Sequence, residues 1–192
     1  MKDGRAMKSL KNIIFNRNPL LILSYLSKNN TGESISSHIA KKLDLAAGSV
    51  HQILRQFEEK GIVQSRQLGK SIIYEIDRQS PLFKSFRIFD NLLDLDDLFT
   101  RLKPMCRKII LFGSCATGDD TSQSDIDMLI VVDSEEREKV MAIISNYEST
   151  REIKPVLVDI VELMEMENND QVFYNEIMKG IEIWEATQGS VL

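Results

Sequence analysis

Hydrophobic positions in the first 80 residues recur at helical spacing in three short segments. In "NPLLILSYLSKN" the apolar residues between Leu20 and Leu26 recur every three or four positions and predict one helix. In "TGESISSHIAKKLD" a second helix is expected to start at Glu33 or Ser34, and "LAAGSVHQILRQFEEKG" predicts a third. Two alternating segments around "RQLGK" then predict a β-hairpin with Gly69 at its tip.

A longer apolar helix is expected over residues 81–104. Ser80 suits a helix cap and Pro81 suits the first helical position. Its apolar stripe is formed by Leu82, Phe86, Phe89 and Leu93, with Leu92, Leu95 and Phe99 beside it. This stripe is too wide for a free linker helix. The sequence leaves open whether the helix packs within its own chain or pairs with a second copy in a homodimer.

The remaining residues, 105–192, alternate between strand and helix patterns. Strands are expected at 107–112 and 126–132 and in "KPVLVDIVEL", and helices in "EEREKVMAIISNYE" and "NDQVFYNEIMKG". Such alternation is typical of an α/β domain. The whole chain is therefore expected to be α+β, with a helical domain and hairpin over 1–80, a connecting helix over 81–104 and an α/β domain over 105–192.

Charge is distributed unevenly between the two halves. The net charge is −5, but residues 1–80 hold 13 Lys and Arg against 7 Asp and Glu, whereas residues 81–192 hold 11 against 22. A basic first half indicates a polyanionic partner, and an acidic second half indicates a different role. Because no apolar run approaches the ~18 residues of a membrane span and no signal peptide is evident, we expect a cytoplasmic protein without a membrane partner. Cys106 and Cys115 show no metal-binding spacing and are expected to be reduced.

The segments "ISSHIAKKLDLAAGSVHQILRQFEEKGIV" and "SRQLGKSIIYEI" resemble the winged helix-turn-helix domain of MarR- and ArsR-type regulators. The resemblance covers roughly residues 15–80 and implies that the third helix enters the DNA major groove while the wing contacts the backbone. The side chains expected to face DNA are Ser49, His51, Gln52, Arg55, Arg66 and Lys70. Arg and Lys would neutralise phosphates, and Gln52 or His51 could reach base edges. The alternative is a winged helix that contacts only proteins.

Carboxylates interrupt two of the strands predicted in the second half. Asp125 and Asp127 are two apart and share one face of their strand, while Asp159 is a lone charge within "VLVDIV". A buried charge is costly unless it is paired or binds a metal. If the two strands are neighbours, the three aspartates converge and suit Mg²⁺ or Mn²⁺, two of which about 4 Å apart can clamp a reacting phosphate. Gly113 and Ser114 form a tight turn that could approach a phosphate.

The segment "GSCATGDDTSQSDIDMLIVV", with "VLVDIV" downstream, resembles the nucleotidyltransferase superfamily of DNA polymerase β, most closely the minimal nucleotidyltransferases. The resemblance implies that Asp125 and Asp127 bind both metals, and that Asp159 binds the catalytic metal and helps to deprotonate the attacking hydroxyl. It further implies that Gly113 and Ser114 hold the triphosphate. The chain departs from the usual pattern at Thr117, where small family members carry a basic residue.

Two functions are compatible with these motifs. The first is a Mg²⁺-dependent transfer of a nucleoside monophosphate from a nucleoside triphosphate, ATP among the candidates, to a hydroxyl. The acceptor could be a protein, since minimal nucleotidyltransferases of this kind include antitoxins that adenylylate a paired HEPN-type toxin; the winged helix could then regulate transcription of its own operon. The alternative is a transcriptional regulator whose catalytically weak nucleotidyltransferase domain senses nucleotide.

Asp119 and Asp120 lie in the loop between Ser114 and Asp125. They are expected to be solvated loop residues and not metal ligands.

Overall fold

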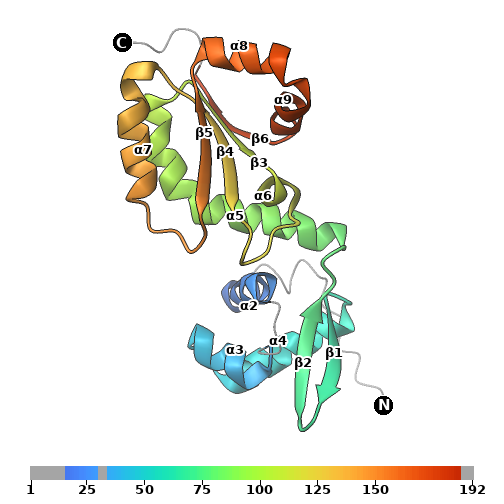
Figure 1. Cartoon of the computed structure of the whole chain (residues 1–192). Coiled ribbons are helices and arrows are strands. Elements are labelled where there is room, and N and C mark those ends of the chain that lie inside the picture. The colour runs from blue at the N-terminus through green and yellow to red at the C-terminus, as the bar shows by residue number, and fades with distance from the viewer. Residues whose placement is uncertain (1–15, 30–33, 187–192) are drawn as a thin grey trace. The chain divides into compact units, whose positions relative to one another are not determined.

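The computed structural model of the chain describes residues 16–29 and 34–186. The chain divides into two compact units, Met1–Phe83 and Lys84–Leu192, and Figure 1 shows the elements of both. None of the helices in these described ranges is long and apolar enough to cross a membrane. Each unit is described by itself below.

The first unit consists of three helices and a hairpin. Its elements are α2 (Arg17–Lys28), α3 (Ser36–Leu43), α4 (Ala47–Glu59), β1 (Val63–Leu68) and β2 (Ser71–Ile76). Apolar side chains from every helix form its core, among them Ile22, Ile39 and Leu54, which have no exposed surface. Leu68 pairs with Ser71, so Gly69 and Lys70 form a two-residue turn.

The predicted elements of this unit are confirmed, including the hairpin tip. Gly69 has a φ of +59°, a left-handed conformation that glycine adopts without a steric penalty. Helix α3 begins at Ser36, two residues after the predicted Ser34, and the alternative start at Glu33 lies outside the described residues.

Helix α5 (Pro81–Leu102) follows the hairpin, as predicted. Leu95, Leu98, Phe99 and Leu102 are buried in the same hydrophobic cluster as the central strands of the second unit. The C-terminal half of α5 is therefore a core helix of its own chain. The predicted stripe does not continue into this core, because Leu82, Phe89 and Leu93 are 50%, 50% and 59% exposed.

A four-stranded sheet forms the centre of the second unit. Its strands are β3 (Lys108–Phe112), β4 (Ile126–Val131), β5 (Ile153–Val158) and β6 (Ile181–Glu185), in the order β5-β4-β3-β6. β4 and β5 run parallel, and the other two pairs are antiparallel. Strand β6 was not predicted, because a short, half-exposed edge strand has too weak a hydrophobic pattern to stand out.

Helices cover both faces of this sheet (Figure 1). Helices α5 and α7 (Arg137–Ser145) pack on one face, and α8 (Ile160–Asn169) and α9 (Gln171–Met178) pack on the other. Strand β4 is apolar almost throughout because both of its faces are covered. The only charged residue within β4 is Asp127, the second residue of the strand.

Candidate functional site

The candidate site lies where β3 ends and β4 begins. Phe112 pairs with Asp127 across these two strands, so the turn that starts at Gly113 lies beside the Asp127 side chain. Gly113 has a φ of +66°, and a Cβ atom at this position would approach Asp127 Oδ2 to 2.7 Å. The backbone conformation favours glycine, and a larger residue would also force the Asp127 carboxylate to shift. Ser114 follows at once as the first residue of the short helix α6 (Ser114–Thr117).

Negative charge accumulates at this end of the sheet. Burial raises the pKa of Asp127, and the charge of Asp125 raises it further. Glu176 of helix α9 acts in the same direction, whereas Lys154 lowers this pKa. Carboxylates that repel one another are stabilised by a bound cation, so the site favours a cationic ligand.

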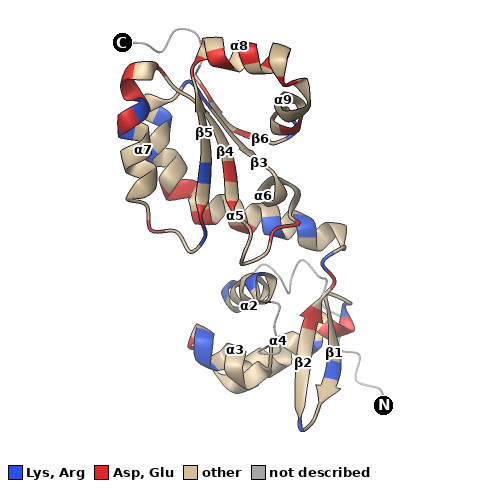
Figure 2. Cartoon of the chain, in the orientation of Figure 1, with Lys and Arg blue, Asp and Glu red and all other residues tan. Residues whose placement is uncertain are grey.

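A lysine occupies the neighbouring strand at the same level. In the parallel pairing of β4 with β5, Lys154 lies opposite Asp127, and Figure 2 shows a basic position on β5 beside an acidic one on β4. Lys154 Nζ lies 2.5 Å from Asp125 Oδ2. The charge that β5 brings to the two aspartates is therefore positive. No pattern in the sequence singled out Lys154, because the partner of its ammonium depends on strand register.

Asp159 lies at the opposite end of the sheet, and its expected convergence with Asp125 and Asp127 is wrong. It follows the last residue of β5, five positions beyond Lys154, which corresponds to roughly 16 Å along a strand. Its Oδ1 accepts hydrogen bonds from the backbone N–H groups of Val161 and Glu162, both at 2.9 Å.

These bonds make Asp159 the N-cap of helix α8, and the side chain of Glu162 accepts a hydrogen bond from the Asp159 backbone at 2.8 Å. This reciprocal arrangement is a capping box. The predicted strand "KPVLVDIVEL" thus ends at Val158, and its second part is helical. The capping role accounts for the lone charge without a metal.

Few protein ligands are available to a divalent cation at this end of the sheet. Within residues 16–29 and 34–186, no three His, Cys, Asp or Glu side chains form a group that could hold a metal ion. Mg²⁺ is often held by only one or two carboxylates, with waters and substrate phosphates completing its shell. Asp125 and Asp127 therefore fit one Mg²⁺ or Mn²⁺ that arrives with a nucleotide. The expected two-ion clamp lacks its third protein carboxylate.

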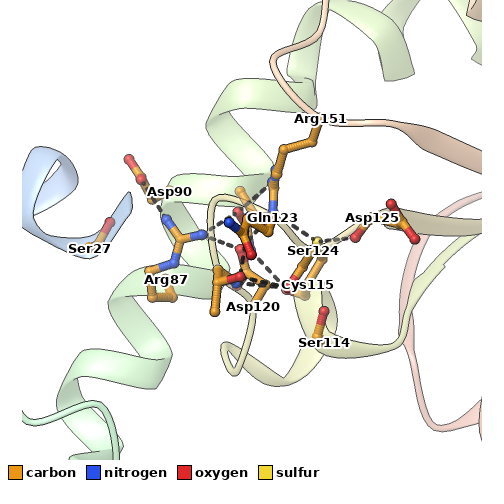
Figure 3. A network of polar contacts seen from close by, with 12 residues as sticks. Ser27, Arg87, Asp90, Ser114, Cys115, Asp120, Gln123, Ser124, Asp125 and Arg151 are labelled. Carbon is orange, nitrogen blue, oxygen red and sulfur yellow. Dashed lines mark hydrogen bonds and ion pairs between the residues drawn. The ribbon is translucent and has the colours of Figure 1, made fainter. Parts of the chain in front are cut away.

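A buried ionic network supports the loop that leads to Asp125 (Figure 3). The guanidinium groups of Arg87, on α5, and Arg151, before β5, both bind the carboxylate of Asp120. The side chains of these three residues are 1%, 9% and 0% exposed. Asn91 donates from Nδ2 to Asp120 Oδ1 at 3.0 Å and to the Cys115 carbonyl at 3.2 Å. The network therefore joins α5 both to α6 and to the loop that follows it.

The expectation that Asp120 is solvated is wrong, because its carboxylate is fully buried. Its neighbour Asp119 is 46% exposed and pairs with Lys84 at 2.6 Å. The sequence held one signal for this network. Arg87 and Asn91 share the buried face of α5 with Leu95, at i, i+4 and i+8, where apolar residues would be expected.

The six residues predicted to face DNA are all exposed. Ser49, His51, Gln52 and Arg55 are on helix α4, and Arg66 and Lys70 are on the hairpin. Arg66 Nε donates to Glu75 Oε1 at 2.7 Å, and Arg55 lies 3.9 Å from Glu59. Of the three basic residues predicted to contact phosphates, Arg55 and Arg66 therefore each have an acidic neighbour, and Lys70 is the third.

Part of the second unit is similar to known proteins. Residues 95–182, which include Gly113, Asp125 and Asp127, match the family described as "Nucleotidyltransferase domain". A protein of Methanocaldococcus jannaschii named "Putative protein adenylyltransferase" is 42% identical over 55 residues, which are 27% of this chain and 56% of that relative. The chain thus matches little more than half of the relative's length. No solved structure matches the chain. The two matches support the prediction of a nucleotidyltransferase.

Proposed function

We propose that this protein transfers a nucleoside monophosphate from a nucleoside triphosphate to a hydroxyl group. The observation that carries the proposal is the contact between the Gly113 turn and Asp127, with Asp125 beside it, inside a nucleotidyltransferase domain. A turn without a side chain next to two carboxylates suits a phosphate chain that arrives with its cation.

Each of these residues has a distinct role in the proposed reaction. The turn at Gly113 and the hydroxyl of Ser114 would bind the triphosphate, and Asp125 and Asp127 would hold a divalent cation. That cation, Mg²⁺ or Mn²⁺, would neutralise phosphate charge. The acceptor oxygen bonds to the α-phosphorus and gives up its proton to water, while the bond between the α-phosphorus and the oxygen that bridges it to the β-phosphorus breaks and pyrophosphate leaves. Asp159 takes no part in this scheme because it lies at the other end of the sheet.

The acceptor is proposed to be a hydroxyl of a protein and the donor to be ATP. The name of the M. jannaschii relative, which includes "protein adenylyltransferase", supports this choice. A HEPN-type partner remains a prediction from the sequence resemblance alone.

The proposal is tested with nucleoside triphosphates labelled at the α-phosphate. Purified protein is incubated with each labelled triphosphate, Mg²⁺ or Mn²⁺, and extract of its own cells as acceptor. We expect label on a protein, and its loss in Asp127→Asn. Asp133→Asn is the matched control, because Asp133 is an exposed aspartate paired with Arg107 on the far end of β4. Absence of both label and nucleotide binding in the wild-type protein would refute the proposal.

A nucleotide-sensing regulator is the second candidate function. Two observations favour it: Lys154 is paired with Asp125, and Thr117, in the place of the usual basic residue, is exposed and donates to the Ser114 carbonyl at 3.3 Å. A sensor would bind nucleotide in the same assay without transferring label to any acceptor.

We further propose that the first unit is a winged helix that binds DNA. Three helices followed by a hairpin, six exposed candidate residues and the basic charge of residues 1–80 support this reading. The logarithm of the affinity for duplex DNA from upstream of the gene should fall linearly with the logarithm of the salt concentration, and Arg55→Ala or Lys70→Ala should each reduce this slope by about one. Lys139→Ala, in the other unit, is the control. Binding that does not depend on salt would instead indicate a protein partner.

A homodimer is proposed on the exposed apolar side of α5. Leu82, Phe89 and Leu93 are at least half exposed and lie at the i, i+7 and i+11 positions of one helix face. Sedimentation should give a dimer for the wild-type protein and a monomer for Leu93→Glu. A wild-type monomer at micromolar concentration would refute this proposal.

A further inference from the structure

Lys154 is the feature of the site that the proposed function leaves unexplained. It belongs to the edge strand β5 and lies opposite Asp127, at the end of the sheet where the Gly113 turn is found. Its ammonium contacts Asp125 at 2.5 Å.

We propose, on the basis of the proposed function, that Lys154 exchanges partners when nucleotide binds: its ammonium holds Asp125 in the free protein and moves to the triphosphate when a divalent cation takes its place. The residue is thus both a competitor of the cation and a ligand of the nucleotide. This assigns Lys154 as a substrate-binding residue of the site.

The competition follows from the chemistry of the shared oxygen. The ammonium of Lys154 and a divalent cation both need the carboxylate of Asp125, and the ammonium lies too close for a second cation to bind there unhindered. The side chains of Lys154 and Asp125 are 52% and 35% exposed. An ion pair this exposed is weak, so a cation delivered with a nucleotide can displace the ammonium.

The second half of the exchange follows from reach and charge. A lysine ammonium is a point charge on a flexible four-carbon stem, so Nζ can move several ångströms without any backbone change. Once released from Asp125, it would lie beside a triphosphate that carries several negative charges on the Gly113 turn. A charge-assisted hydrogen bond to a phosphate oxygen replaces the lost bond to the carboxylate.

The test uses the full chain and two separate binding titrations. Free Mn²⁺ is titrated by electron paramagnetic resonance without nucleotide, and ATP is titrated by calorimetry at a Mn²⁺ concentration that saturates both the nucleotide and the protein site. For Lys154→Met, which keeps the length of the side chain, we expect Mn²⁺ affinity to rise roughly three- to tenfold. We expect the affinity for ATP in the presence of saturating Mn²⁺ to fall about tenfold, because the released ammonium then no longer binds the triphosphate. Lys154→Arg should keep ATP affinity near the wild-type value.

Lys139→Met is the matched control, since Lys139 is also an exposed lysine (65%, against 52% for Lys154) and is paired with Glu136 at 2.8 Å on helix α7. It removes the same charge and should change neither affinity, and thermal melts confirm that each variant is folded. Shifts of opposite sign in Lys154→Met alone support the exchange. Unchanged affinities, or shifts in the same direction, overturn it while leaving the proposed function standing. A wild-type protein that binds neither Mn²⁺ nor ATP overturns both.

Discussion

Replacement of Asp120 by alanine should severely destabilise the second unit. The substitution removes the carboxylate that two guanidinium groups share, and the side chains of Arg87 and Arg151 are only 1% and 9% exposed. Water cannot readily replace the lost partner at such a buried position. The effect is therefore that of leaving buried charge without its main counter-ion.

The magnitude can be worked out from the contacts that remain. Breaking a buried ion pair by removing one partner costs about 3–5 kcal/mol. Arg87 retains Asp90 at 3.3 Å, and Arg151 retains the Asn91 side chain at 3.0 Å, which favours the lower end of this range. With a urea dependence of about 1.5 kcal/mol per M, a loss of about 3 kcal/mol lowers the unfolding midpoint by about 2 M.

Trp184 provides a selective assay. It is the single tryptophan of the chain and lies on β6 of the second unit, with Nε1 donating to the Cys106 carbonyl at 3.3 Å. Its fluorescence during urea unfolding therefore reports the second unit independently of the first.

Asp119→Ala is the matched control for this experiment. Asp119 is the preceding residue and forms an ion pair with Lys84, but it is 46% exposed. Exposed pairs contribute about 0–1 kcal/mol, so the midpoint should move by less than about 0.7 M. Similar midpoints for Asp119→Ala and Asp120→Ala would refute the conclusion that the buried network holds this loop.

Three further predictions concern Asp159, Gly118 and the two cysteines. Asp159→Ala should cost about 1 kcal/mol through loss of the α8 cap and leave Mn²⁺ binding unchanged; loss of Mn²⁺ binding would contradict its assignment as a cap. Gly118→Ala should destabilise the second unit by more than about 2 kcal/mol, because Gly118 has a φ of +74° and a Cβ atom would overlap the backbone of α5. Gly48→Ala, with open space around the site, should not destabilise the first unit when urea unfolding is followed by circular dichroism. Burial raises the pKa of Cys106 to about 12 and of Cys115 to about 11, so both thiols should react with DTNB at pH 8 only on unfolding; rapid reaction in folded protein would show that they are accessible.

Local patterns in the sequence predicted most of the secondary structure. Helical periodicity predicted α2, α4 and α7, and the alternation around Gly69 predicted the hairpin. The turn at Gly113 and the pair Asp125 and Asp127 were also correct as neighbours, because they depend on a strand, a tight turn and a spacing of two residues. Such features are determined by residues close together in the chain.

The partner of those aspartates could not be predicted in this way. Asp159 and Lys154 both belong to the segment around β5, and the sequence favours the carboxylate because a charge in an apolar strand looks like a metal ligand. Which of the two meets Asp125 depends on the parallel register of β5 and on its end at Val158. Lys154 and Asp159 are five residues apart, so their positions along the strand direction differ by roughly 16 Å.

The sequence by itself therefore determined most of the elements, but not β6 or α8, together with the glycine turn and the two aspartates of the candidate site. Only the tertiary structure decided that Lys154 lies beside Asp125, that Asp159 caps a helix, and that Asp120 is buried between Arg87 and Arg151, which are 33 and 31 residues away along the chain. The physical reason is that periodicity and turn chemistry are properties of adjacent residues. Charge pairing and burial depend instead on which distant segments the packed sheet brings together.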